Sequence, residues 1–124
     1  MKYKRWAIWR VNLDSVVGSE QGFTRPVLII SDDAINELIN TVNIIPITSR
    51  KSNRLIYPNE VLLESLVYGL PEESIVLCHQ IRTIDKKRFA QFYEEINDIQ
   101  TQNEIIEALF FQFGIDAPYI QQIQ

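Results

Sequence analysis

The segment Val16–Ser31, which reads VVGSEQGFTRPVLIIS, joins a polar, glycine-containing loop to a continuous apolar run. An apolar run of this length, bounded by turn residues, predicts a buried β-strand over residues 26–31. Arg25 stands where the loop meets the strand, and Pro26 fixes the backbone directly after it. Because a guanidinium group stays charged and binds phosphate through parallel hydrogen bonds, this junction predicts an anion site at the mouth of a strand.

Short apolar or β-branched runs separated by polar turns surround this segment and predict a chain made mostly of strands. The expected strands are 6–13, 26–31, 41–47, 60–63 and 74–84, the last being the longest. The segment 89–96 fits either a strand or a helix. The expected connections are loops at 14–24 and 48–57, a turn at 67–71 and one helical turn at 85–88. Ser31-Asp32-Asp33 is expected to cap a short helix over 34–38.

A helix is expected at the C-terminal end of this series. Thr101 with Glu104 three residues later fits a capping box, and Gly114 ends the run. Apolar residues recur between them at helical spacing: Ile105, Ile106, Leu109, Phe110 and Phe113. We expect Phe110 and Phe113 to face the sheet and Phe111 to lie exposed as a partner surface, or else under the 115–124 tail. The pattern predicts a mainly β fold with α (α+β), an SH3-like small barrel with a C-terminal helix.

The composition fits one globular domain over residues 1–124, with 46% hydrophobic and 23% charged residues. The single cysteine, Cys78, lies in an apolar run and is expected to be a buried, unreactive thiol. One cysteine and one histidine offer too few ligands for zinc, and no carboxylate cluster marks the loop, so neither a metal nor a cofactor is expected. The N-terminus lacks the apolar run of a signal peptide and no segment can span a bilayer, so we expect a cytoplasmic protein without membrane contact.

The net charge of −4 is divided unevenly along the chain. Residues 1–54 carry eight basic and five acidic side chains, whereas residues 55–124 carry four basic and eleven acidic ones. Such asymmetry fits a surface for an anionic ligand in the first half, although uneven scatter of exposed charges explains it equally well.

Two further segments extend the signal of the first. One is Ile45-Pro46-Ile47-Thr48-Ser49-Arg50, and the other is residues 74–86, SIVLCHQIRTIDK. With Val16–Ser31, they resemble the MazF/PemK family of toxin endoribonucleases, the effector halves of bacterial type II toxin–antitoxin pairs. The three segments follow the family's order and spacing from residue 16 to residue 86. The resemblance implies a small barrel of the CcdB/PemK type.

The resemblance also implies an activity, the metal-independent cleavage of single-stranded mRNA at short sequence motifs. In this reaction the 2′-hydroxyl of RNA attacks the adjacent phosphate, leaving a 2′,3′-cyclic phosphate and a 5′-hydroxyl. Arg25 is suited to stabilising the charge that develops on the phosphate. In the family a threonine pairs with this arginine, and Thr48 occupies the matching position. By itself a threonine at a strand end is more often a turn former.

RNA binding is expected to involve both loops and the long third segment. Arg50, Lys51 and Arg54 form a basic loop cluster that would attract phosphates, unless it is simply a solvated loop face. The first loop resembles the family's recognition loop. The expected RNA-binding residues are Ser19, Glu20, Gln21, Ser49, Arg50, His79 and Gln80.

Two aromatic residues leave alternatives open. On the predicted strand His79 shares a face with apolar neighbours, which favours a packed, hydrogen-bonded histidine over a functional one. The family commonly has Glu or Asp at this position. Phe23 could stack on a base, but closing over the core beneath the loop is the favoured expectation.

The resemblance implies a homodimer with RNA in the groove between subunits, and a MazE-like antitoxin whose acidic, disordered tail competes for that groove. The alternatives are a non-enzymatic CcdB-like toxin and an inactive regulatory dimer. One departure bears on them, because the family begins its first strand with Arg-Gly-Asp and this chain has Arg5-Trp6-Ala7. This change puts the support of the first loop in doubt.

Overall fold

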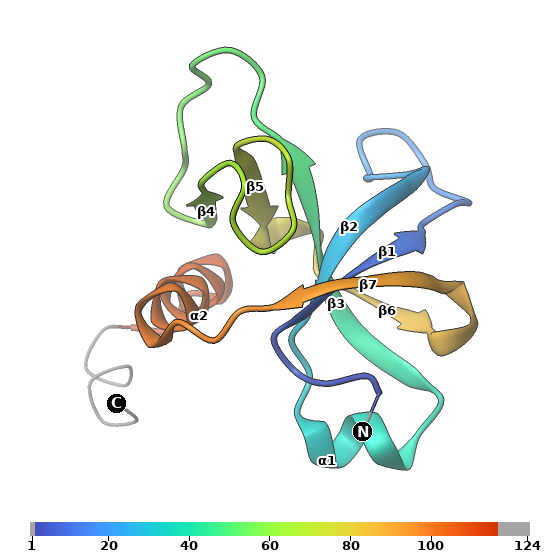
Figure 1. Cartoon of the computed structure of the whole chain (residues 1–124). Coiled ribbons are helices and arrows are strands. Elements are labelled where there is room, and N and C mark those ends of the chain that lie inside the picture. The colour runs from blue at the N-terminus through green and yellow to red at the C-terminus, as the bar shows by residue number, and fades with distance from the viewer. Residues whose placement is uncertain (1, 117–124) are drawn as a thin grey trace.

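The computed structural model describes residues 2–116, which form an antiparallel sheet with one long and one short α-helix (Figure 1). The strands are β1 (Ala7–Asn12), β2 (Thr24–Ile29), β3 (Thr41–Ser49), β4 (Glu60–Leu63), β5 (Ser74–Leu77), β6 (Arg82–Asp85) and β7 (Phe89–Glu95). The helices are α1 (Asp33–Leu38) and α2 (Ile99–Phe113), and two 3-10 turns are η1 (Cys78–Gln80) and η2 (Lys86–Arg88).

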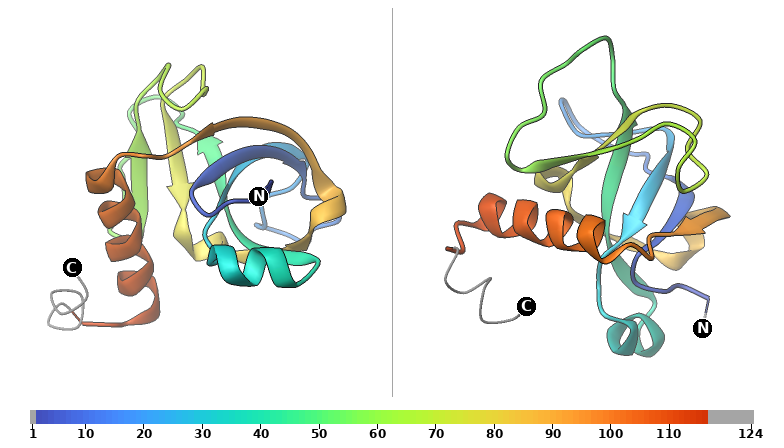
Figure 2. Two further views of the ribbon diagram at one scale, coloured as in Figure 1. Left: turned by 60° about the horizontal axis from the view of Figure 1, so that its bottom comes forward. Right: turned by 60° about the vertical axis from the view of Figure 1, so that its left-hand side comes forward.

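The sheet follows an open path in the order β4-β5-β3-β2-β1-β7, with β6 pairing with β3 off this path. Strand β3 is the common element, because its first residues pair with β6 and its last residues pair with β5. Figure 2 shows how β1, β2, β3 and β7 curl around one another while α2 lies beside β4 and β5. The mainly β fold with a C-terminal helix is therefore confirmed.

Two apolar clusters fill the two faces of the curled sheet. Ile8 and Leu28 belong to the cluster covered by α2, whereas Trp9 and Val27 belong to the cluster on the other face. Successive side chains of a strand point to opposite faces, so β1 and β2 contribute to both clusters. This double burial explains why the run after Arg25 is apolar without alternation.

The expected single strand over 74–84 is wrong. Ile47 pairs with Val76 and Ile44 pairs with Arg82. A step of three residues along β3 therefore corresponds to a step of six residues along the β5–β6 segment. The three additional residues fold out of the sheet as η1. The sequence pattern cannot show this break, because it arises from the register with β3. The ambiguous segment 89–96 forms strand β7 over Phe89–Glu95.

The caps of α2 differ in part from expectation. Asp98, not Thr101, is the N-cap, and its carboxylate accepts a hydrogen bond from the Thr101 backbone N–H at 3.1 Å. The Thr101 hydroxyl also donates to this carboxylate, and these bonds lower the pKa of Asp98. Gly114 ends the helix in the left-handed conformation, as expected. Asp32 caps α1 from the expected cluster.

The aromatic end of α2 is more exposed than the sequence predicts. Phe111 is exposed as expected, but Phe113 is exposed as well, with 58% of its surface accessible, so the expectation that it faces the sheet is wrong. The residues from 117 onward, where a covering tail was considered, lie outside the described residues. Within the described part, no helix is long and apolar enough to cross a membrane.

Candidate nucleic-acid interface

Arg25 and Thr48 meet where β2 and β3 separate. The pairing Val27↔Pro46, continued by two residues, places Arg25 opposite Thr48. The Arg25 Nη1 donates to Thr48 Oγ1 at 3.3 Å, and its Nε donates to the Gly22 carbonyl at 2.7 Å. Both partners are neutral, and within residues 2–116 no carboxylate forms an ion pair with Arg25. The half-buried guanidinium therefore keeps an uncompensated charge.

The first loop, residues 14–23, is held in shape by its own polar groups. The Leu13 N–H donates to the Phe23 carbonyl at 2.8 Å, and the Phe23 N–H donates to Asp14 Oδ1 at 2.7 Å. Gly22 is buried, and a Cβ added there would lie 2.7 Å from Val16 Cγ2. Any larger residue would displace Val16, so glycine suits the point where the loop returns to Arg25.

Side chains facing solvent occupy the outer part of this loop. Glu20 accepts a hydrogen bond from the Val17 N–H at 2.5 Å, which leaves its second carboxylate oxygen free for a ligand. Phe23 is 73% exposed, so the favoured expectation that it closes over the core is wrong. It lies at φ 61°, in the left-handed region. An exposed ring beside the loop is available for stacking.

The turn η1 lies against the first loop. Gln80 Nε2 donates to the Ser19 carbonyl at 3.3 Å, and Gln80 Oε1 accepts from the Gln21 N–H at 3.4 Å. His79 is exposed in this turn and does not lie on a strand, so the expectation of a histidine packed among apolar strand neighbours is wrong.

Two hollows adjoin η1. The first, of about 370 Å³, is lined by Thr48, Ser49 and Lys51 among others, and we name it the Thr48 hollow. The second, of about 470 Å³, is lined by Glu20 and Arg82 among others, and we name it the Arg82 hollow. Four residues line both: Ser19, Gln21, His79 and Gln80.

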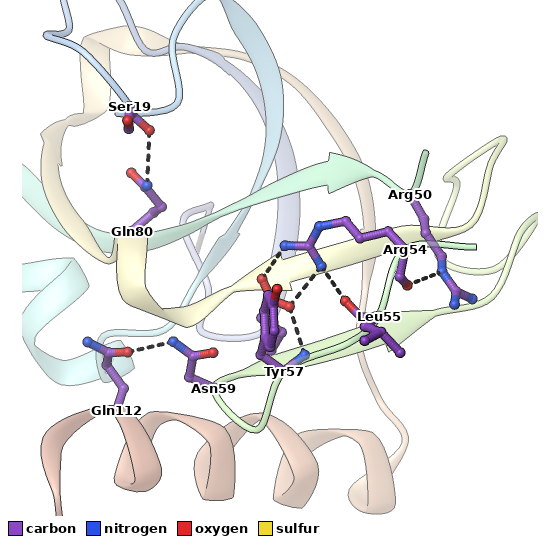
Figure 3. A network of polar contacts seen from close by, with 9 residues as sticks. Ser19, Arg50, Arg54, Leu55, Tyr57, Asn59, Gln80 and Gln112 are labelled. Atoms are coloured by element: carbon purple, nitrogen blue, oxygen red, sulfur yellow. Dashed lines mark hydrogen bonds and ion pairs between the residues drawn. The ribbon is translucent and has the colours of Figure 1, made fainter. Parts of the chain in front are cut away.

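The second loop uses most of its cations internally, as Figure 3 shows for part of the network. Arg54 binds the carboxylate of Glu60 through two hydrogen bonds of 2.9 and 2.7 Å. These bonds, and the Tyr57 N–H that also donates to Glu60, lower the pKa of the buried carboxyl. Arg50 contacts Glu73 at 3.3 Å and donates to the Arg54 carbonyl. In the described chain Lys51 is the one residue of this cluster whose side chain has no partner.

Two residues that the sequence analysis did not single out also support the first loop. Arg82 donates to the Leu13 carbonyl at 3.1 Å, and Arg88 donates to the Asn12 carbonyl at 3.1 Å and to the Asp14 carbonyl. The four basic residues of the chain beyond residue 54 all fall between 82 and 88. This grouping of basic residues could have indicated their role, but the negative net charge of residues 55–124 hid it.

The structure brings most of the predicted site residues to one region. Arg25 and Thr48 touch, and five of the seven expected RNA-binding residues line the Thr48 hollow: Ser19, Gln21, Ser49, His79 and Gln80. Glu20 lines only the Arg82 hollow, and Arg50 lines neither hollow. No group of three or more His, Cys, Asp or Glu side chains that could hold a metal ion occurs among residues 2–116.

The departure at Arg5-Trp6-Ala7 lies away from this region. The backbone of Trp6 bonds to Ile29 and Ile96, at the opposite end of β1 from the first loop. Its ring packs on the apolar cluster under α2, and the Arg5 guanidinium lies 4.9 Å from the ring centroid. Trp6 adopts φ 75°, a conformation that a glycine adopts without strain. The substitution therefore changes the start of β1 and not the support of the loop.

Buried Cys78 plays no part in this surface. Desolvation, and to a lesser degree the charge of Glu60, raise the pKa of its thiol to about 12. The expected unreactive thiol is confirmed, because the thiolate is the reactive form.

Comparison with known proteins agrees with this geometry. A family model described as the PemK-like, MazF-like toxin of type II toxin–antitoxin systems matches residues 4–110. An endoribonuclease from a mycobacterial species, solved with its cognate antitoxin, is 23% identical with a TM-score of 0.75, over 93% of this chain and 98% of that chain. The Mycobacterium tuberculosis toxin MazF-mt6 is 23% identical with a TM-score of 0.73, over 90% and 99%.

MazF from Deinococcus radiodurans is 27% identical with a TM-score of 0.73, over 90% of this chain and 96% of that chain. The likeness to the mycobacterial structures concerns the fold. The family match covers the loop–strand junction at Arg25, both hollows and most of α2. This chain belongs to the PemK-like, MazF-like toxin family of type II toxin–antitoxin systems.

Proposed function

We propose that this protein is a toxin endoribonuclease that cleaves single-stranded mRNA at short sequence motifs without a metal ion, acting as one domain. The observation that carries the proposal is the Arg25–Thr48 contact, in which a half-buried guanidinium has only neutral partners. A charge held in this way is preorganised for an anion, and its partners compete weakly with a phosphate. One solved structure that the chain resembles is itself described as an endoribonuclease.

In the proposed reaction the 2′-oxygen of a nucleotide attacks the neighbouring phosphorus, the bond to the 5′-oxygen breaks, and a 2′,3′-cyclic phosphate forms. The proton of the 2′-hydroxyl is lost and the departing 5′-oxygen gains one. Arg25 binds the non-bridging oxygens, whose charge increases in the five-coordinate transition state. The Thr48 hydroxyl, which now accepts from Arg25, donates to a phosphate oxygen when RNA is bound.

RNA contacts beyond the scissile phosphate follow the two hollows. Lys51 and Ser49 lie at the Thr48 hollow and are suited to backbone phosphates and hydroxyls, which position RNA without reading sequence. Glu20, His79 and Gln21 line the hollows with groups that recognise base edges, and exposed Phe23 offers a stacking surface. Arg50 lines neither hollow, and it would have to leave its ion pair with Glu73 to bind a phosphate.

The proposed partners are RNA, a second copy of the chain and a MazE-like antitoxin with an acidic disordered tail, all in the cytoplasm. An acidic segment matches the uncompensated charges of Arg25 and Lys51 and would order on binding. The homodimer is supported by the exposed ring of Phe111, which borders a hollow of about 470 Å³ between α2 and β4. In a two-fold dimer, both copies present the same patch.

A second candidate function is a non-enzymatic toxin of the CcdB kind, or an inactive regulatory dimer, that works by protein contact. The exposed aromatic end of α2 would serve either role. The Arg25–Thr48 contact favours the nuclease, since a protein-binding role requires no isolated guanidinium beside a hydroxyl.

The test is incubation of purified protein with single-stranded RNA in EDTA, followed by analysis of the new ends. We expect 5′-hydroxyl and 2′,3′-cyclic phosphate ends from the wild type and strongly reduced cleavage by Arg25→Ala. Activity that is lost in EDTA and restored by Mg²⁺ or Mn²⁺ would point to a different class of nuclease. If the RNA remained intact, the nuclease proposal would fail and the non-enzymatic function would be the remaining candidate.

Sedimentation at micromolar concentration tests the assembly. We expect a dimer, and we expect Phe111→Glu to shift it toward monomer because a buried charge is costly at an apolar interface. Exposed Ile99, on the first turn of α2, provides a matched control as Ile99→Glu. A monomer of 14.5 kDa that still cuts RNA would refute a groove shared by two subunits.

A further inference from the structure

The first loop is fixed from one side by side chains of the segment 78–88. Gln80 binds the Ser19 carbonyl and the Gln21 N–H, so both halves of its amide are used by the loop backbone. Arg82 and Arg88 bind backbone carbonyls at the beginning of the same loop. Three side chains from one short segment thus satisfy backbone groups that a surface loop would otherwise expose to water.

Gln80 also connects the loop to the reacting centre through consecutive contacts. Its Oε1 accepts from the Gln21 N–H, and the carbonyl of the following residue, Gly22, accepts from Arg25 Nε. Arg25 in turn contacts Thr48. The position of Gln80 therefore bears on the position of the loop that presents Gln21 to both hollows.

Figure 3 shows the bond between Gln80 and Ser19. Both residues line each of the two hollows. Both ends of this amide are bound to the loop backbone, so turning it to present its full edge to a base would break both bonds. From these contacts we infer that Gln80 is a positioning residue that sets cleavage-site selectivity by fixing the first loop. It does not act by contacting a base. This inference rests on the proposed function and refines the role expected for Gln80.

The two possible roles of Gln80, direct base contact and positioning of the loop, lead to different changes in the cleavage motif when Gln80 is replaced. Removing a base reader changes the preference at one position of the RNA motif. Releasing the loop loosens the preference at every position that the loop contacts. Arg88 separates the two cases, because it anchors the Asn12 and Asp14 carbonyls and lines neither hollow. If loop position matters, Arg88→Met broadens selectivity in the same way as Gln80→Met.

The experiment compares Gln80→Met and Arg88→Met with two matched controls. Gln91→Met and Lys87→Met change an exposed glutamine and an exposed basic residue, and neither side chain has a partner within the described chain. Mapping 5′-hydroxyl ends in a randomised RNA pool gives the cleavage motif of each variant. Amide hydrogen exchange of the loop, followed by NMR without RNA, reports its fixation independently of activity.

We expect exchange at the Gln21 amide to rise about fivefold or more in Gln80→Met, as for loss of a typical hydrogen bond. We expect both test variants to tolerate substitutions at several motif positions, while the controls keep the wild-type motif. The inference would be overturned if Gln80→Met changed the preference at a single motif position while Arg88→Met kept the wild-type motif. Unaltered exchange at the Gln21 amide in Gln80→Met would also overturn it. If the wild type itself cuts no RNA, the proposed function fails and the exchange result alone decides the positioning role.

Discussion

Two arginines of this protein have different surroundings: Arg25 lies at the start of β2, and Arg54 lies in the loop between β3 and β4. Arg54 forms two hydrogen bonds with the buried carboxylate of Glu60, and its guanidinium carbon lies 5.4 Å from the Tyr57 ring centroid. Arg25 binds one carbonyl and one hydroxyl. The charge of Arg54 is neutralised within the fold, whereas that of Arg25 is available to a ligand.

The number of contacts does not separate an arginine that supports the fold from the one that we propose to bind RNA. Both residues are fixed by at least two hydrogen bonds. The charge of the partners separates them, because a carboxylate competes with a phosphate for the guanidinium and a carbonyl does so weakly. We therefore expect substitutions at Arg25 to reduce activity and substitutions at Arg54 to reduce stability.

The largest expected effect is on catalysis by Arg25→Ala. Loss of one preorganised group that stabilises the transition state lowers a rate by about 100- to 1000-fold. Stability should change little, because the neutral partners of Arg25 can bind water. Single-turnover cleavage assays and urea unfolding measure the two quantities. Near wild-type turnover in a folded Arg25→Ala protein would remove Arg25 from the mechanism.

The opposite pattern is expected for Arg54→Ala. This change leaves the Glu60 carboxylate without its cation, and because the Arg54 side chain is partly exposed we expect a loss of about 1–3 kcal/mol in the free energy of unfolding. The double variant Arg54→Met/Glu60→Leu should recover part of this loss, since it removes the buried charge as well. If Arg54→Ala unfolds like the wild type, the pair does not hold the second loop.

A steric change in the first loop tests how Arg25 is held in place. Gly22→Ala places a Cβ 2.7 Å from Val16 Cγ2 and 3.0 Å from Asp14 Oδ1, so the loop must shift. We expect a loss of about 1–3 kcal/mol in stability. Activity should fall as well, because the Gly22 carbonyl holds Arg25. Val17→Ala, at an 80% exposed position of the same loop, is the control.

The smallest expected effect concerns pH. The pKa of Glu60 is lowered by its hydrogen bonds, so its ionised form stabilises the fold at pH values above the unfolded pKa of about 4.3. This contribution is lost as the pH falls through the lower, folded pKa. The stability gap between wild type and Glu60→Gln should therefore be largest near pH 7 and narrow below about pH 4. A gap that is constant between pH 7 and pH 3 would show that the carboxyl is not perturbed.

The sequence was sufficient to predict the features that depend on local pattern. The sequence predicted the loop–strand junction at Arg25, a cap of α1 within Ser31-Asp32-Asp33, the end of α2 at Gly114 and the buried thiol of Cys78. Each depends on the residue type and its immediate neighbours in the chain. The family resemblance identified Thr48, which a local pattern alone would have assigned to a turn.

The features that were missed depend on contacts distant in sequence. The break of the 74–84 run follows from the register with β3, and exposed His79 follows from that break. The internal pairing of Arg54 depends on the burial of Glu60, which the polar sequence of the second loop does not reveal. The support of the first loop by Arg82 and Arg88 joins segments about 70 residues apart.

A paired measurement of two lysine substitutions tests the contrast between the arginines most directly. Arg25→Lys and Arg54→Lys both keep a positive charge, and both lose the two-pronged geometry of the guanidinium. We expect Arg25→Lys to lose most RNA cleavage in EDTA at unchanged stability, and Arg54→Lys to keep cleavage within a few-fold while losing stability. Full cleavage by Arg25→Lys together with loss of cleavage by a folded Arg54→Lys would contradict the assignment of the two arginines.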